Sequence, residues 1–347
     1  MKKIFSCILA IIILGAMLSG CSNNDSKEMI KKAKNFSIPH EVSINPTKED
    51  YGILAYNFLH YIQDNYPGRI AGTEKEKEMA VFILSALLNG GYSEKDISIQ
   101  SFNITEAVPM MDESIKNKFE GGKQSNSSQN IKVVKKGESE KTIVVGAHYD
   151  SAGTHGVDDN GSGIAVALEN ALRMADTQTH YTICYIFFGS EENGMCGSRE
   201  DIVLMINIDS VLAGDYHYLY GGNVNEHGKV DRAEAVVKAY DIAKKLGLAI
   251  QLPPEGNIDY PYPTGQKRSD HAPFNDIGIP YIYFEANNWE NGSPIETEKH
   301  GLIMHTDKDD LDFIENEYGE RAKNTLTDYS TLLYSLLQEN DWEQEYK

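Results

Sequence analysis

The chain has 347 residues, 41% of them hydrophobic, and carries 52 acidic against 32 basic side chains, a formal net charge of −20. This length accommodates one large domain or two small ones, and the hydrophobic content is sufficient for a buried core. Nucleic-acid binding is not expected, because a phosphate backbone attracts clusters of Lys and Arg and this chain is strongly acidic.

The first segment has the pattern of a secretion signal. Two lysines precede an apolar run, residues 4–18, that is shorter than the roughly 20 residues a membrane-spanning helix needs. The run ends in Leu-Ser-Gly-Cys21, which resembles the lipobox of bacterial lipoproteins. This resemblance implies cleavage before Cys21, lipidation of its thiol and an extracytoplasmic protein anchored by lipid to the cell membrane. The alternative is an uncleaved anchor with a chance cysteine.

The next segments are expected to form a tether and then helices. Residues 1–20 are the predicted signal peptide, and residues 21–45, rich in Lys, Asn and Ser, are the predicted tether. One helix is expected over about 49–65. A second starts at a capping box formed by Thr73 and Glu76 and ends at a Gly-Gly pair.

Residues 96–102 alternate like an edge strand, and the polar stretch 116–130 is expected to be a loop. Strand-like and helix-like segments alternate from residue 131 onward, as in the βαβ units of a mostly parallel sheet. Strands are expected at about 131–134, 142–147, 181–188, 202–208 and 279–284. Helices are expected at about 162–174 and 231–246 and in an amphipathic C-terminal segment that includes Ala322, Leu326, Tyr329, Leu333 and Leu336.

These elements predict one α/β domain over residues 46–340, a three-layer αβα sandwich around a central, mostly parallel mixed sheet. Apart from Cys21 and the leader, two cysteines remain. Cys184 lies in a strand-like run and is expected to be a small buried hydrophobe. A disulfide between Cys184 and Cys196 is permitted outside the cytoplasm. The absence of a Cys-x-x-Cys pair from the sequence argues against a thiolate zinc site.

Acidic and imidazole groups gather in five clusters where strand-like runs give way to Gly, Asn or Ser. The clusters are His148 with Asp150, Asp158 with Asp159, Glu191 with Glu192, Asp209, and His305. Each alone has an ordinary structural explanation, such as a turn or a helix N-terminus. Together, at strand ends where an open α/β sheet binds ligands, they favour a divalent metal and above all zinc. Without a cation, such converging acids would repel one another.

The motifs resemble those of the zinc aminopeptidase family of metallopeptidase clan MH, of the bacterial leucyl aminopeptidase type. They run from Arg69-Ile-Ala-Gly72-Thr through Gly146-Ala-His148-Tyr-Asp150-Ser and Gly156-Val-Asp158-Asp159-Asn-Gly-Ser-Gly163 to Ser269-Asp270-His271-Ala-Pro-Phe274 and His305-Thr. The resemblance implies a phosphorylase/hydrolase-like fold, two zinc ions per chain and removal of N-terminal residues from peptides. We expect a monomer.

The resemblance also implies a role for each residue. One zinc would be held by His148 and Asp209 and the other by Glu192 and His305, with Asp158 bridging both and a cis peptide between Asp158 and Asp159. Two cations about 3.5–4 Å apart can share one carboxylate and one water. Glu191 would be the general base that takes a proton from the water and passes it to the leaving amine.

Further residues are expected around the metals. Asp150 lies two positions after His148, so both side chains point the same way and Asp150 can accept the second imidazole N–H. Asp309 is a candidate for the same role toward His305. The group Asp270 and His271 is expected near the substrate or the base, or else is a capped turn. We expect the aromatic residues Tyr218, Tyr220 and Trp289 either to line a specificity pocket or to pack in the core.

One departure from the family pattern concerns Arg199–Asp201, the only residues between Gly197-Ser198 and the strand near Ile202. A parallel crossover needs a dozen or more residues, so this short segment puts the position of Asp209 in question. Three other functions remain open: a single-zinc glutaminyl cyclase, a carboxypeptidase of the same clan, and a non-catalytic surface binding lipoprotein. The retained ligands and base favour the aminopeptidase.

Overall fold

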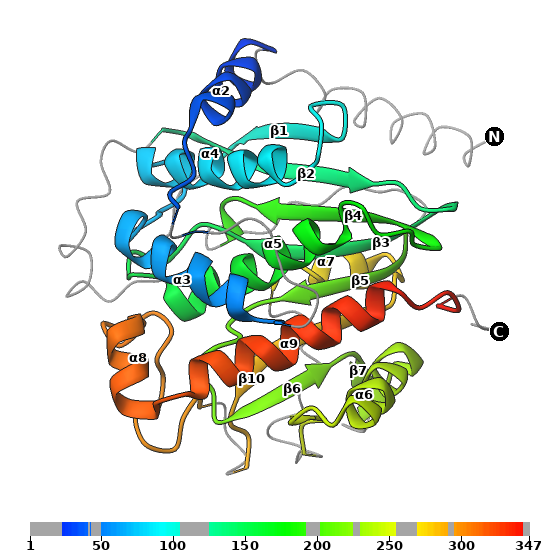
Figure 1. Cartoon of the computed structure of the whole chain (residues 1–347). Coiled ribbons are helices and arrows are strands. Elements are labelled where there is room, and N and C mark those ends of the chain that lie inside the picture. Colours follow the sequence, from blue (N-terminus) through cyan, green and yellow to red (C-terminus); the bar gives the residue numbers. More distant parts are fainter. Residues whose placement is uncertain are drawn as a thin grey trace, which may run out of the picture.

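The structure, a computed structural model, describes residues 23–40, 42, 50–104, 125–191, 202–224, 230–254, 269–290 and 295–342. Its centre is an eight-stranded sheet in the order β1-β2-β4-β3-β5-β10-β6-β9 (Figure 1). The four parallel central strands are β4 (Tyr181–Phe188), β3 (Ser139–His148), β5 (Ile202–Ile208) and β10 (Tyr281–Asn287). The flanking strands are β1 (Ile97–Asn103), β2 (Ser127–Lys135), β6 (Tyr216–Tyr220) and β9 (Ile250–Gln251), and β7 (Gly222–Val224) pairs separately with β8 (Val230–Arg232).

The central strands form because their sequences are nearly continuous apolar runs, typical of strands covered on both faces. In β4, seven of the eight residues are buried, and all seven residues of β10 are buried. In β1, by contrast, half-buried and exposed residues largely alternate, as predicted for an edge strand. The strands expected from the sequence are therefore confirmed, whereas β6 to β9 were not predicted.

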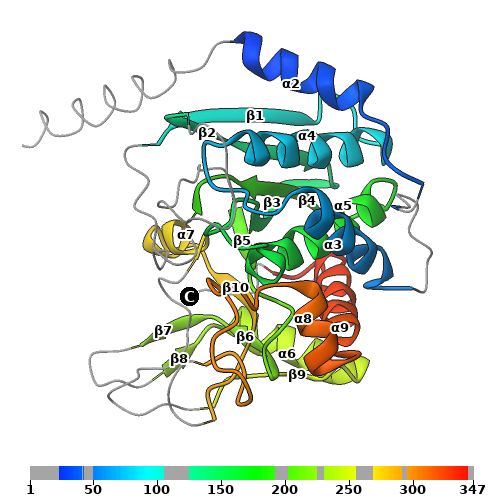
Figure 2. The same cartoon turned by 90° about the vertical axis from the view of Figure 1, so that its left-hand side faces the viewer.

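Helices cover both faces of the sheet. On one side lie α3 (Ile53–Asn65), α4 (Glu74–Asn89), α5 (Gly163–Met174), α6 (Glu234–Leu246) and α9 (Arg321–Leu337), and on the other lies the short α7 (Ala272–Asp276) (Figure 2). A further helix, α8 (Leu311–Tyr318), precedes α9. The larger core lies under the first group and the smaller one includes Phe274 of α7. The predicted αβα architecture is confirmed.

The N-terminal part of the expected tether is a helix, α2 (Asn23–Asn35). Ala33 is fully buried, Met29 packs against the main core, and the Phe36 and Phe82 ring centroids lie 6.3 Å apart. The apolar residues at 29, 33 and 36 recur at helical spacing, which is a signal for a helix. The sequence analysis instead followed the Lys- and Asn-rich composition and predicted a tether. Among the described helices, none is long and apolar enough to cross a membrane.

Residues 116–124 of the expected loop lie outside the described part of the chain, and the end of the stretch is not a loop, since β2 begins at Ser127. Three polar residues of this strand are buried and hydrogen-bonded. Ser128 donates to the Glu76 carboxylate, Gln129 Nε2 donates to the Tyr149 hydroxyl at 2.5 Å, and Asn130 Oδ1 accepts from Gly189 N at 3.1 Å. These three residues are polar because their side chains form buried hydrogen bonds, and not because the strand is exposed to solvent.

One contact fixes the start of α5 against the sheet, and another fixes α5 against α3. A Cβ on Gly163 would lie 2.4 Å from the Ile208 carbonyl oxygen, so only glycine permits this approach to β5. In the middle of the helix, buried Glu169 accepts hydrogen bonds from the Gly52 and Ala55 amides at the start of α3, at 3.0 and 2.8 Å, and pairs with Arg173 at 2.8 Å. Breaking a buried pair of this kind costs about 3–5 kcal/mol. These contacts hold α3 and α5 together.

Candidate metal centre

The carboxyl ends of the central parallel strands meet at one edge of the sheet. His148 is the last residue of β3 and lies opposite Phe188, the last residue of β4. Asp209 directly follows β5, and its amide donates to the Phe284 carbonyl of β10 at 3.1 Å. Such an edge is where open α/β sheets bind ligands, and the polar groups predicted at the strand ends do converge there.

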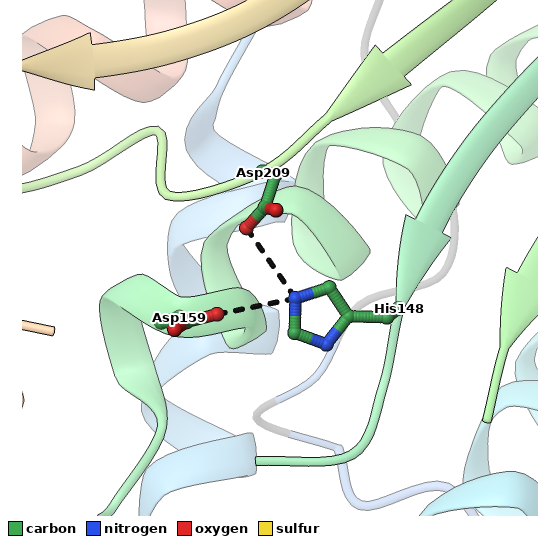
Figure 3. Close-up of side chains that lie close together, drawn as sticks. All are labelled: His148, Asp159 and Asp209. Atoms are coloured by element: carbon green, nitrogen blue, oxygen red, sulfur yellow. Dashed lines mark ion pairs between the residues drawn. The ribbon is translucent and has the colours of Figure 1, made fainter. Parts of the chain in front are cut away.

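Three buried side chains form the candidate centre, His148, Asp159 and Asp209. His148 Nε2 lies 3.1 Å from Asp159 Oδ1 and 3.4 Å from Asp209 Oδ1 (Figure 3). One ligand atom from each of the three lies within 4.8 Å of the other two. The chemistry of this donor set fits zinc, which binds imidazole nitrogen and carboxylate oxygen.

His305 faces the same carboxylate from the opposite side. Its Nε2 lies 2.9 Å from Asp159 Oδ2, and its backbone takes the left-handed conformation, with φ 58°. Each oxygen of Asp159 therefore faces a different imidazole. A carboxylate shared by two cations needs this arrangement.

In the structure it is Asp159, and not the predicted Asp158, whose carboxylate faces both imidazoles. Asp158 Oδ1 accepts hydrogen bonds from the Leu212 and Ala213 amides, at 2.9 and 3.3 Å. The cis peptide joins Asp159 to Asn160 and does not join Asp158 to Asp159. Two adjacent acids in one turn are equivalent in a sequence pattern, and only the backbone conformation of the turn decides which carboxylate faces His148.

Asp150 connects the imidazole to the turn that carries Glu191. Asp150 Oδ1 lies 3.4 Å from His148 Nδ1 and accepts the Glu191 amide at 3.0 Å. Asp150 thus lies next to His148, as predicted. Glu191 follows β4 at the same edge of the sheet. Glu192 lies outside the described residues, so its role as a ligand stays a prediction.

The short connection before β5 does not displace Asp209. Residues 192–201, which include Cys196 and Arg199–Asp201, lie outside the described part of the chain. β5 nevertheless pairs in parallel with β3, with Gly146 opposite Asn207. Asp209 therefore emerges beside His148 as the ligand pattern requires. Cys184 is buried in β4, and its disulfide with Cys196 stays untested.

The cluster favours a positive charge. Burial by itself would lower the pKa of His148, yet Asp209, Asp150 and Asp159 raise that pKa well above its ordinary value. Burial likewise opposes ionisation of Asp159, but His148 and His305 lower its pKa well below the usual range. Since the carboxylates stabilise cationic charge so strongly at this point, the same place suits a divalent cation.

A second set of acids lies behind Asp158. Asp309 accepts from the Asp158 amide at 2.6 Å and from Thr154 Oγ1 at 3.1 Å, in place of the predicted support for His305. Burial, with the Asp159 charge, raises the pKa of Asp309 to about 7. Burial and Glu296 likewise raise the pKa of Asp158 well above its ordinary value. The sequence analysis missed Glu296, because no strand end or motif marks it.

Asp270 and His271 lie beside β5, with the imidazole in the smaller core. Asn207 Nδ2 donates to Ser269 Oγ at 2.8 Å and lies 3.4 Å from His271 Nδ1. The His271 ring stacks against Tyr281 and Tyr283, with centroids 4.5 and 4.7 Å away. The predicted pocket aromatics Tyr218, Tyr220 and Trp289 are buried in the same smaller core. For these three, the core interpretation is the one that the structure supports.

A buried imidazole and carboxylate cluster at the strand ends of an αβα sheet is an arrangement typical of metal-dependent hydrolases. The sequence profile of peptidase family M28 matches residues 130–330, more than half of the chain. The chain belongs to this family, as the motif resemblance predicted.

Several known proteins are similar in sequence. The alkaline phosphatase isozyme conversion protein of Escherichia coli is 28% identical over 70% of this chain and 74% of its own length. The aminopeptidase YwaD of Bacillus subtilis is 28% identical over 58% of this chain, but the match spans only 44% of that protein. A probable lipoprotein aminopeptidase of Mycobacterium tuberculosis, LpqL, is 35% identical over 27% of this chain and 19% of its own.

Solved structures share the fold. BSAP, a zinc aminopeptidase from Bacillus subtilis, matches with a TM-score of 0.60 and 19% identity, covering 85% of this chain and 97% of that one. Porphyromonas gingivalis glutaminyl cyclase matches with a TM-score of 0.56 and 20% identity, covering 83% and 98%. Identities this low establish the fold alone. A zinc aminopeptidase and a glutaminyl cyclase therefore share this architecture.

Substituting each of the adjacent acids tests the corrected assignment. Changing a residue that hydrogen-bonds a metal ligand typically weakens metal binding about 10–100-fold. If Asp159 is itself a ligand, Asp159→Asn should weaken zinc binding by at least about 100-fold. Asp158→Asn should keep zinc affinity within a few-fold and lower thermal stability, because its carboxylate bonds the Leu212 and Ala213 amides. Competition with a chelator measures both affinities. The reverse ranking would restore Asp158 as the ligand.

Proposed function

We propose that the protein is a zinc-dependent aminopeptidase that removes N-terminal residues from peptides outside the cytoplasm. The observation that carries this proposal is the position of Asp159, whose two oxygens face His148 and His305. Family membership and similarity to proteins named as aminopeptidases support it.

The proposal assigns the ligands as two sets that share one carboxylate. His148 and Asp209 would hold the first zinc, His305 and Glu192 would hold the second, and the Asp159 carboxylate would be a ligand common to both. When bound, the zinc ions supply a water activated at neutral pH and polarise the scissile carbonyl.

The chain's own residues then handle the protons. Glu191 accepts the proton of the attacking water and delivers it to the leaving amine. The backbone amide of Glu191 donates a hydrogen bond to Asp150, whose carboxylate also faces His148 Nδ1. Asp150 therefore helps to fix the position of the base relative to His148. The acid-rich edge also attracts the free α-ammonium group of a peptide, which an aminopeptidase must recognise.

Zinc quantification combined with a substrate panel tests this function. The purified protein should hold two zinc ions per chain, hydrolyse aminoacyl amides with a free α-amine and lose activity with a chelator until zinc returns. N-acetylated versions of the same substrates, the matched control, should remain intact. A stable single zinc together with full conversion of N-terminal glutamine peptides would establish the glutaminyl cyclase alternative. Metal binding without turnover of either type would favour a binding lipoprotein.

The base is tested by an isosteric change. Glu191→Gln should reduce kcat by at least about 100-fold, because general acid–base groups contribute about 10²–10⁴-fold. Its zinc content should equal that of the wild type. Glu290→Gln, which changes an exposed acid that belongs to none of the clusters, is the matched control and should retain activity. Undiminished turnover in Glu191→Gln would remove this residue from the mechanism.

We also propose that Cys21 carries a lipid that anchors the mature chain to the cell membrane. The leader pattern supports this, and the name of the Mycobacterium tuberculosis relative is consistent with it. Cys21→Ser should move the protein from the membrane fraction to the soluble extracytoplasmic fraction, and mass spectrometry of the wild type should find an acylated N-terminal cysteine. A Cys21→Ser variant that stays in the membrane fraction would contradict the anchor.

A further inference from the structure

We propose that Arg69 is a positioning residue for the metal centre, because its buried guanidinium holds the loop of residues 149–156 that connects His148 to Asp159. We call this segment the ligand loop. The inference rests on the proposed zinc function, and it assigns a role to a residue that touches neither metal nor substrate.

The guanidinium of Arg69 donates to backbone carbonyl oxygens at both ends of the ligand loop. Nε donates to Tyr149 O at 2.8 Å, Nη1 to His155 O at 3.0 Å and Nη2 to Gly156 O at 2.8 Å. Nη1 also donates to Tyr66 O at 3.2 Å, which fixes the side chain to its own segment. The side chain is fully buried, so these bonds are protected from water.

The backbone around Arg69 bonds to the same loop. Ser151 N donates to the Arg69 carbonyl at 3.1 Å, and Gly68 N donates to the Thr154 carbonyl at 2.9 Å. Residues 68–69 and the ligand loop thus join through the side chain and the main chain. The ligand loop forms no helix or strand, so its buried carbonyls need donors of this kind.

The contacts lie next to the ligands in the chain. Tyr149 directly follows His148, and Gly156 precedes Asp159 by three residues. Gly156 takes a left-handed φ of 64°, and a Cβ there would lie 2.9 Å from Arg69 Nη2 and 2.5 Å from the Ser151 Cβ. The loop therefore closes tightly around the guanidinium, and moving Arg69 would shift the backbone next to His148 as well as the backbone that leads to Asp159.

Arginine is suited to this task because its planar guanidinium presents five N–H donors in a rigid fork, whereas lysine offers three donors at one point. Fixing the loop in advance spares metal binding the cost of ordering it. Asp150 also lies in the ligand loop, so the support extends to the carboxylate that holds the Glu191 amide.

The test compares two arginines whose side chains are both nearly fully buried. Arg69→Lys and Arg69→Met remove the fork, and Arg173→Lys is the matched control. Arg173 donates to Glu169 and to Asp50 O, each at 2.8 Å, in the last turn of α5. Zinc Kd is measured by chelator competition on folded protein, and thermal stability and kcat/KM are recorded beside it.

Arg69→Lys should weaken zinc binding about 10–100-fold, the usual effect of changing a group that orients ligands. Arg173→Lys should lower the melting temperature and leave zinc Kd within about two-fold of the wild type. Amide exchange at Ser151 and Gly156 in chelator-treated protein should be faster in Arg69→Lys than in the wild type or the control. Arg69→Met should show the same changes more strongly.

Wild-type zinc affinity in folded Arg69→Lys would overturn the inference. An equal loss of affinity in Arg173→Lys at the same loss of stability would also do so, since the effect would then be general. Failure of the proposed function gives a different result, in which the wild type itself binds no zinc while the exchange difference in the ligand loop persists.

Discussion

The contact between the His148 imidazole and the Asp159 carboxylate determines what the rest of the structure must hold in place. One partner ends a strand and the other lies in a turn before a helix, so the contact between them is not formed by the regular hydrogen bonding of a single element. The sheet fixes His148 beside Asp209, and Gly163 lets the turn approach β5. The site therefore depends on tertiary packing between a strand end and a turn, which explains the density of buried polar bonds around it.

Asp158 shows how this packing is achieved. Its backbone amide donates a hydrogen bond to Asp309, and its carboxylate accepts one from the segment after Asp209. This one residue therefore connects the turn to two other parts of the chain. The adjacent acids thus divide the work, since Asp159 faces the cation-favouring centre and Asp158 secures the turn. Burial raises the pKa of Asp158, Asp309 and Glu296, so ionisation of these three carboxyls is disfavoured, whereas His148 and His305 lower the pKa of Asp159.

Much of this could be predicted from the sequence, and the limits are physical. Buried strands such as β3 and β4 and helices such as α4 follow from apolar runs and capping signals, and the strand-end rule located His148, Asp150, Asp159 and Asp209 in one region. The choice between Asp158 and Asp159 depends on turn conformation, which composition does not encode. The roles of Arg69 and Glu296 depend on burial and partners far along the chain. The helix α2 was missed because exposed lysines outnumber the few apolar residues that pack.

The packing of α2 on α4 bears on how the enzyme would work at a surface. Only Ser22 separates Cys21 from the first residue of α2, and Ala33 near the other end of that helix is buried in the core. If Cys21 carries the proposed lipid, a single residue would separate the lipidated cysteine from a helix that packs on the domain, so the domain would stay close to the membrane surface.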